Sequence, residues 1–260
     1  MFIDTHCHLD ILPEKSLQID EEIEKAKNED VSFVVESIDS FESNFTSVEL
    51  SKKYKNFVFS LVGVHPQQVQ NAPKNYLEVL QKLIDKNSEN IVGIGEVGVD
   101  LHYSETLLTK RVQLEIFENL IELSIKNNLP VAIHTWDSFD ETFEILSKFA
   151  GRVRGVIHSF SYTKIEAKKF LEKLDFFISF TGALTYPKNH HLHEAIVNLP
   201  KEKIVFETDA PFLPPTGFRG KPNSPRFVKE VYKFAKENFG ISESQIFENS
   251  KKLFGAKFVL

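Results

Sequence analysis

The sequence predicts an α/β protein of one domain, residues 1–260, in which eight parallel strands close into a barrel. The first observation is a set of eight short apolar segments rich in β-branched and aromatic residues. The second is that segments with helical periodicity separate them, and strand–helix alternation favours parallel strands joined by crossover helices. The third is the length, because 260 residues is close to the roughly 250 that a closed barrel of this kind takes.

The expected elements follow one another along the whole chain. The strands are expected at Met1–His6, Val31–Ile38, Phe57–His65, Ile91–Val99, Pro130–His134, Arg152–His158, Phe176–Phe180 and Lys203–Glu207. Helices are expected at Tyr76–Lys86, Leu108–Lys126, Ser138–Phe149, Lys164–Leu174, His191–Leu199, Pro225–Phe239 and Ser242–Phe254. The segment Pro211–Pro225 is rich in Pro and Gly but too short to link two domains, so we expect a loop over a functional site.

Composition restricts the class of protein. The chain has 31 basic and 37 acidic residues, a net charge of −6, which is not typical of a protein that binds duplex DNA nonspecifically through a basic stripe. Cys7 is the single cysteine, so no internal disulfide forms, in keeping with the reducing cytoplasm. No apolar run reaches the roughly 18 residues of a membrane span, and the N-terminus does not resemble a signal peptide. We therefore expect a cytoplasmic protein with no membrane contact and no obligate protein partner.

The first expected strand ends in a His-x-His motif. Residues two apart on a strand point to the same face, so His6 and His8 direct their imidazoles to one place, while Cys7 between them faces the opposite side and is interpreted as a small buried residue. Two neutral imidazoles at the end of a strand suit a divalent metal ion.

Other strand ends carry further polar groups. The candidate ligands among them are Glu96, His134, His158 and Asp209, and His65 follows the third expected strand. Ionisable groups at the ends of apolar strands are costly unless they are paired or bind a metal, and catalytic groups of such barrels lie at these ends. Four imidazoles and two carboxylates exceed what one tetrahedral ion needs, so the sequence predicts two divalent ions (Mg, Mn or Zn), with Glu96 as the bridge and a hydroxide between them as the nucleophile.

Several polar and aromatic residues near these ligands allow two interpretations. Glu207 is interpreted mainly as a structural carboxylate that hydrogen-bonds nearby groups, and the tract His190, His191 and His193 mainly as solvent-exposed. His102 is either a rim residue or a phosphate contact. Trp136 is either an aromatic packed under a loop or a surface on which a base stacks.

These motifs together resemble the TatD family of metal-dependent deoxyribonucleases, within the amidohydrolase-like metallohydrolases. The matching segments are Phe2–Asp10, Gly63–Pro66, Ile94–Asp100, Leu129–Thr135, His158–Ser161, Glu207–Pro214 and the late segment Asn223-Ser224-Pro225. They occur in the family's order over nearly the whole chain. The chain differs from the family's usual pattern in having Trp136 where the family usually has Arg.

The resemblance implies a TIM (β/α)8 barrel that hydrolyses phosphodiester bonds in DNA, often as a 3′ exonuclease with Mg²⁺ or a similar ion, on single strands or strand ends. By position, His6, His8 and Asp209 would hold one ion, and His134 and His158 the other, with Glu96 between them. His65, His102 and Asn223 are the expected substrate contacts. Asp209, Glu96 and His65 are the expected catalytic residues.

Two other functions remain open at this point. One is hydrolysis of a small ester or amide, as in amidohydrolases of the same architecture, because the predicted metal chemistry does not choose between carbonyl and phosphoryl centres. Many of those enzymes bridge their metals with a modified lysine, and Glu96 in that place favours the nuclease. The other is a metal-binding scaffold with little turnover that acts through protein partners.

Overall fold

Eight parallel strands form one sheet in chain order, as a computed structural model of residues 1–103 and 106–255 shows. Residues 104–105 and 256–260, which the predicted domain includes, lie outside the described residues. The strands are β1 (Phe2–Cys7), β2 (Val31–Glu36), β3 (Val58–Val62), β4 (Ile91–Asp100), β5 (Val131–Trp136), β6 (Arg154–Ile157), β7 (Asp175–Phe180) and β8 (Ile204–Phe206). All eight predicted strands are confirmed, with boundaries shifted by a few residues.

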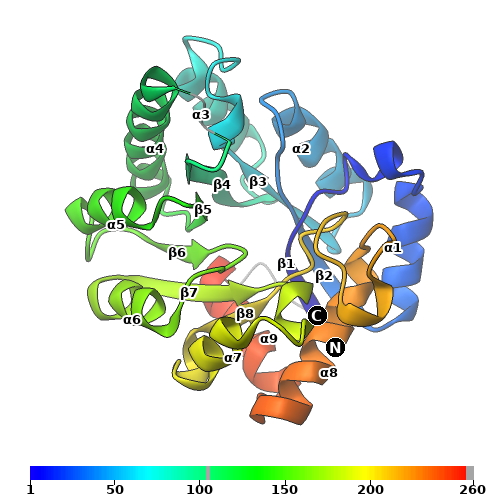
Figure 1. Cartoon of the computed structure of the whole chain (residues 1–260). Helices are drawn as coiled ribbons and strands as arrows, with labels where there is room; N and C mark the ends of the chain where they lie inside the picture. Colours follow the sequence, from blue (N-terminus) through cyan, green and yellow to red (C-terminus); the bar gives the residue numbers. More distant parts are fainter. Residues whose placement is uncertain (104–105, 256–260) are drawn as a thin grey trace.

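The helices surround the strands, as Figure 1 shows. They are α1 (Ile19–Asn28), α2 (Ser43–Lys53), α3 (Tyr76–Lys86), α4 (Leu107–Asn127), α5 (Phe139–Lys148), α6 (Lys164–Lys173), α7 (His190–Val197), α8 (Val228–Phe239) and α9 (Glu243–Phe254). The seven predicted helices are confirmed, although the first turn predicted for Pro225–Phe239 is a 3-10 turn, Pro225–Phe227. In the described part of the chain, no helix has the length and apolar character to cross a membrane.

Hydrogen bonds close the barrel between its first strand and the segment after its last. The Asp209 amide donates to the His6 carbonyl at 2.9 Å, and the His8 amide donates to the Ala210 carbonyl at 2.7 Å. Lower on the same seam, the Thr5 hydroxyl donates to the Phe206 carbonyl at 3.0 Å. The predicted closed barrel is therefore confirmed, and its seam joins the two segments that carry the His-x-His motif and Asp209.

The apolar side chains of the strands belong to two separate clusters. The barrel interior holds one residue or two from each strand, including Ile3, Val92 and Val205, and is covered at one end by Leu253 and Phe254 of α9. The larger cluster lies between the strands and the outer helices and includes Cys7, which faces away from the interior as predicted. Apolar side chains fill the barrel interior, and in barrels of this type the functional groups lie at the C-terminal end.

Candidate metal centre

Seven ionisable side chains meet at the C-terminal end of the barrel, each from the C-terminal half of a strand or from the first three residues after it. They are His6, His8, His65, Glu96, His134, His158 and Asp209. All are buried except His134, which is half-buried. The structure thus brings together every residue that the sequence analysis named as a metal ligand.

One group of ligand atoms lies at the barrel seam. His6 Nε2 and His8 Nε2 are 3.3 Å apart, and Asp209 Oδ1 lies 3.5 Å from His8 Nε2 and 3.9 Å from His6 Nε2. Asp209 takes a left-handed backbone conformation with φ of 57°, which Asp tolerates better than most residues. The buried Asp4 carboxylate fixes the preceding residue by accepting hydrogen bonds from the Thr208 amide at 2.8 Å and hydroxyl at 2.5 Å.

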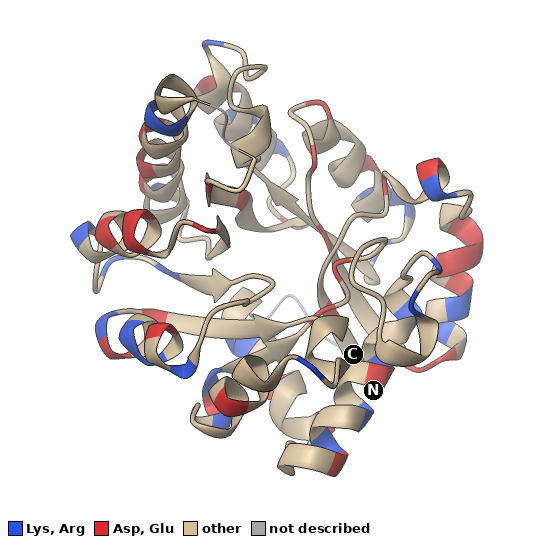
Figure 2. Cartoon of the chain, viewed as in Figure 1, with Lys and Arg blue, Asp and Glu red and all other residues tan. Residues whose placement is uncertain are grey.

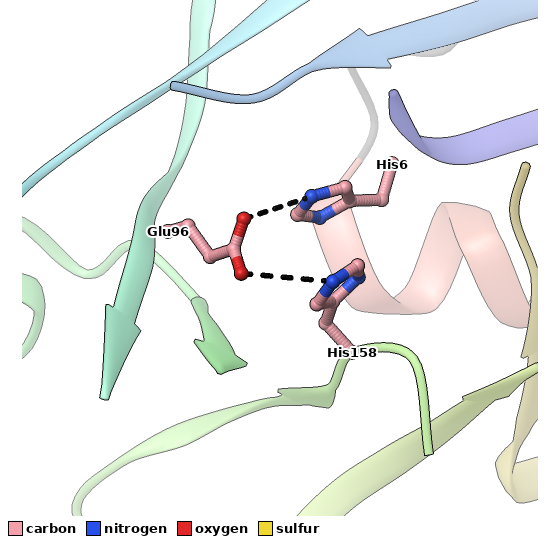
Figure 3. Close-up of side chains that lie close together, drawn as sticks. All are labelled: His6, Glu96 and His158. Carbon is pink, nitrogen blue, oxygen red and sulfur yellow. Dashed lines mark ion pairs between the residues drawn. The ribbon is translucent and has the colours of Figure 1, made fainter. Parts of the chain in front are cut away.

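Glu96 stands at the middle of the cluster. Its two carboxylate oxygens point to different imidazoles, Oε2 to His6 Nε2 at 3.2 Å and Oε1 to His158 Nε2 at 3.6 Å (Figure 3). Oε1 also lies 2.5 Å from His134 Nδ1 and 3.6 Å from His65 Nε2. Glu96 therefore touches imidazoles from both sides of the cluster, which is the position required of a bridging carboxylate.

Gly98 allows β4 and β5 to approach closely enough for Glu96 to reach His134. Its φ is 151°, and a Cβ atom there would lie 1.9 Å from the His134 carbonyl oxygen. A side chain at this position would push the two strands apart.

The donor set fits divalent metal ions. Among the described residues, the buried atoms without a hydrogen-bond partner include His6 Nδ1, His8 Nδ1 and Glu96 Oε2. Two imidazole nitrogens that face each other at 3.3 Å, next to a carboxylate oxygen with no aligned donor, are costly in a buried site unless a cation or protons satisfy them. Imidazole and carboxylate are the usual ligands of Zn²⁺ and Mn²⁺, and carboxylate also suits Mg²⁺.

Three sets of ligand atoms are compact enough to hold an ion. They are His6–Glu96–His158, His6–His8–Asp209 and His65–Glu96–His134. The second set equals the predicted first site. Among the described residues no such set holds both His134 and His158, whose ring centroids are 6.4 Å apart, so their sharing of one ion stays a prediction.

Two further carboxylates support the imidazoles from outside. Glu207 Oε1 lies 2.9 Å from His158 Nδ1, a close contact that is not aligned as a hydrogen bond, and accepts a hydrogen bond from the Ser159 amide at 2.6 Å. This agrees with the structural interpretation of Glu207. Asp100 Oδ2 lies 3.1 Å from His134 Nε2. Carboxylates in such positions orient metal-binding histidines and raise their basicity.

Sequence analysis did not name Asp100 or Glu36 as site residues. Asp100 is four residues after Glu96 on the same strand, and that even spacing on a strand is a signal that could have found it. Glu36 is buried at the end of β2 and accepts hydrogen bonds from the amides of Leu9 and Asp10, at 2.6 and 3.1 Å. It thereby holds the chain that follows His8.

Opposite charges shift the pKa values within the cluster. Burial lowers the pKa of His158, but the carboxylates of Glu207, Glu96 and Asp209 outweigh burial and raise it to about 10. Burial raises the pKa of Glu96 and of Asp209, but the charge of His158 and of other imidazoles outweighs it and holds both below their usual values. In the metal-free cluster His158 is therefore ion-paired with these carboxylates at neutral pH, whereas burial lowers the pKa of His6.

His8 and His134 follow the same rule. Burial lowers the pKa of each, but a hydrogen bond to Asp209 raises that of His8, and one to Asp100 raises that of His134, in both cases to about 9 with the help of Glu96. An arriving metal ion replaces these protons, since only the neutral imidazole binds metal.

The predicted substrate contacts lie in different surroundings. His65 lines the cavity above the cluster. His102 is exposed and pairs through Nδ1 with Asp137 Oδ2 at 2.9 Å. Asn223 is fully buried, and its amide donates to the carbonyls of Thr208 and Phe212, so it holds the loop after Asp209 and is not among the residues that line the cavity.

The cavity above the cluster has a volume of about 620 Å³. Besides the ligands, its walls include Tyr103, Trp136, Phe212 and His191, and none of its described lining residues is Lys or Arg. Figure 2 shows many of the basic residues on the outer helices. Of the predicted histidine tract, His191 lines the cavity, whereas His190 is exposed and His193 contacts the Leu184 carbonyl at 2.8 Å through Nε2.

Comparison with known proteins identifies the family. The profile of the family described as TatD related DNase matches residues 3–255. The chain belongs to the TatD family. Its curated relatives include the uncharacterized metal-dependent hydrolase YabD of Bacillus subtilis, 31% identical over 98% of this chain and 99% of the relative. Another is YcfH of Escherichia coli K12, with the same description, 34% identical over 94% and 90%.

Solved structures agree with this assignment. The TatD homologue YjjV of Escherichia coli superposes with a TM-score of 0.88 at 27% identity over 97% of both chains. A TatD family hydrolase of Entamoeba histolytica, at 22% identity and a TM-score of 0.85, shares the fold. The chain is thus a TatD-family, metal-dependent hydrolase with the TIM-barrel fold that the sequence analysis predicted.

Proposed function

We propose that this TatD-family hydrolase cleaves phosphodiester bonds in DNA and uses two divalent ions to do so. The observation that carries the proposal is the overlap of the three ligand sets, because His6 and Glu96 each belong to two of them. Shared donors of this kind support a pair of ions bridged by Glu96, as in other enzymes that displace groups at phosphorus.

In this proposal His6, His8 and Asp209 hold one ion, His134 and His158 hold the other, and Glu96 contacts both. When bound, such ions supply Lewis-acid polarisation of a phosphoryl oxygen and lower the pKa of water. Asp209 is the proposed proton acceptor, because its carboxylate is anionic at neutral pH and borders the cavity.

His65 is the proposed substrate contact rather than a ligand, despite its place in the third set. Its Nδ1 accepts a hydrogen bond from the Gln67 amide at 3.2 Å, which leaves the ring proton on Nε2. A protonated Nε2 cannot bind a metal but can donate to a phosphate oxygen or to the leaving group. The hydrogen bond to Gln67 therefore favours the role that the sequence analysis gave His65.

The cavity supports a strand end as substrate. Its volume of about 620 Å³ is within the roughly 300–1,000 Å³ typical of small-ligand pockets and suits a terminal nucleotide better than a duplex. The described lining has no Lys or Arg to follow a phosphate backbone, so one phosphate held at the metals is the main charged contact. We propose exonuclease action, from the 3′ end as the family resemblance implies.

The test is hydrolysis of end-labelled single-stranded DNA by metal-free protein resupplied with Mg²⁺, Mn²⁺ or Zn²⁺. Asp209→Asn is the inactive variant, and Asp175→Asn, which changes an exposed carboxylate at the start of β7, is the matched control. We expect a metal-dependent ladder from the 3′ end with wild type and Asp175→Asn, and none with Asp209→Asn. Equal cleavage by all three proteins contradicts the proposal.

One observation favours a second candidate, a hydrolase of a small ester or amide. The described lining of the cavity includes apolar and aromatic groups and no Lys or Arg, which also suits a small substrate of low charge. Hydrolysis of aryl esters or amides by the metal-loaded protein, with no cleavage of DNA under any of the three metals, would establish this alternative.

A further inference from the structure

We infer that Trp136 is a stacking platform for the base of the nucleotide whose phosphate lies at the metals. This inference rests on the proposed function and adds how the site selects its substrate. It starts from the position of Trp136 on β5, two residues after His134. The two side chains share a face of the strand, and their ring centroids are 6.4 Å apart. The indole therefore lies next to the metal cluster at the cavity wall.

The exposure of Trp136 argues against the alternative that it is an aromatic packed under a loop. Its side chain is 40% exposed, whereas Val131, Ala132 and Ile133 on the same strand are almost completely buried. Exposed apolar side chains grouped at the mouth of a cavity often mark a ligand-binding site. Tyr103 and Phe212, at 58% and 43% exposure, are the other large aromatic side chains at this rim.

Neighbouring residues hold the indole in place. The His102 ring stacks on it with centroids 4.6 Å apart and planes 5° from parallel, and Asp137 holds His102 by its Nδ1 at 2.9 Å. The Tyr103 ring meets Trp136 edge-on at 5.3 Å and 89°. His102 is not among the residues that line the cavity, whereas Trp136 and Tyr103 are, so His102 supports the indole from behind.

A nucleobase is the ligand that this arrangement fits. Bases present a flat π face that stacks on an indole, and stacking does not depend on which base is present. A phosphate attached to the same nucleotide is attracted to the neighbouring metal site, so the platform and the metals together select a nucleotide with an unpaired base. A base within a duplex already stacks on its neighbours and cannot reach the platform without leaving the helix.

Trp136 is the single tryptophan of the chain, so its fluorescence reports directly on its surroundings. The test titrates the metal-loaded protein with deoxyadenosine 5′-monophosphate and with deoxyribose 5-phosphate, which lacks the base. We expect the nucleotide to quench the fluorescence and to bind about 5- to 150-fold more tightly than the sugar phosphate, the fold-change equivalent to about 1–3 kcal/mol of stacking. Equal affinities and no quenching overturn the inference.

Two variants separate a stacking role from an apolar or structural one. Calorimetric titration of Trp136→Phe is expected to keep most of the preference for the nucleotide, because a ring face remains. Trp136→Leu, which keeps apolar area without a ring face, is expected to bind both compounds alike. A preference that survives unchanged in Trp136→Leu overturns the inference.

Cleavage of a single strand with an abasic terminal nucleotide separates this inference from the proposed function. Slower removal of the abasic end than of a normal end supports the platform, and equal removal overturns it while nuclease activity stands. If no strand is cleaved but the nucleotide still quenches Trp136 and outbinds the sugar phosphate, the platform stands and the proposed reaction fails.

Discussion

The floor of the cavity, formed by the ionisable cluster, and its rim, formed by Trp136, Tyr103 and Phe212, differ in burial and in charge. At the floor, Glu96 is 1% exposed and contacts imidazoles on both sides, and additional carboxylates hold His158 and His134 from outside. At the rim, Trp136 and Tyr103 are 40% and 58% exposed and contact one another through ring faces and edges. In the proposed function this difference separates two tasks: buried charges arranged in advance perform the chemistry, and exposed rings select what enters.

The largest expected effect comes from removing a charge at the floor. Asp209→Asn should lower kcat by at least about 1,000-fold, equivalent to about 4 kcal/mol of barrier, because it changes the proposed metal ligand and removes the proposed proton acceptor. Turnover of DNA by the purified variant measures this, with circular dichroism to show that the barrel remains folded. A kcat within tenfold of wild type would contradict the proposed role of Asp209.

The apparent affinity for metal should rise about tenfold per pH unit for each proton that the metal ion displaces. In the metal-free protein the pKa of His158 is raised to about 10 and that of His8 to about 9, so these groups hold protons that a metal ion must displace. Apparent affinity should therefore rise from pH 6 towards pH 9. Calorimetric titration with Zn²⁺ in two buffers of different ionisation enthalpy measures the protons released, and release of none would contradict the ion-paired floor.

The same pKa shifts determine the direction in which the stability of the metal-free protein changes with pH. A histidine whose pKa is raised on folding contributes stability that is fully present below its unfolded value of about 6.5 and is lost as the pH rises through its folded value of about 9 to 10. The melting temperature of the metal-free protein should thus fall between pH 7 and pH 10 more than that of the metal-loaded protein.

A smaller effect should follow from the outer carboxylates. Asp100→Asn should reduce metal affinity or activity by about 10–100-fold, since carboxylates that orient a ligating histidine have effects of this size. Asp85→Asn, an exposed change on α3, is the matched control and should leave both unchanged. Metal titration of the two variants measures this. Equal metal affinity in both would contradict a supporting role for Asp100.

The smallest effect concerns salt and tests the rim. With no Lys or Arg among the described residues that line the cavity, one phosphate contact at the metals implies that KM for a short single strand changes by about threefold or less between 50 and 200 mM salt. Steady-state kinetics at the two salt concentrations measure it. A change in KM of about 1,000-fold would show that a series of basic residues crosses the rim and contacts the phosphate backbone. That result would contradict the description of the rim as free of basic side chains.

The sequence predicted the floor better than the rim for a physical reason. Strand periodicity placed His6 and His8 on one face, and parallel strands in a barrel bring their ends together whatever the loops do. Glu36 was not predicted as a site residue because the predicted strand extended to Ile38, which placed Glu36 inside the strand. In the structure Glu36 is the last residue of β2. Asn223 was expected at the substrate, but its side chain is saturated by backbone groups, which only the folded loop reveals.

The hydrogen bonds between His6, His8 and the segment Asp209–Ala210 also bear on synthesis. They join positions about 200 residues apart, so the cluster cannot assemble before both segments have been synthesised. A nascent chain interrupted before Asp209 lacks both a ligand and the closing seam. In the proposed function, hydrolytic competence therefore requires a chain synthesised at least as far as Asp209.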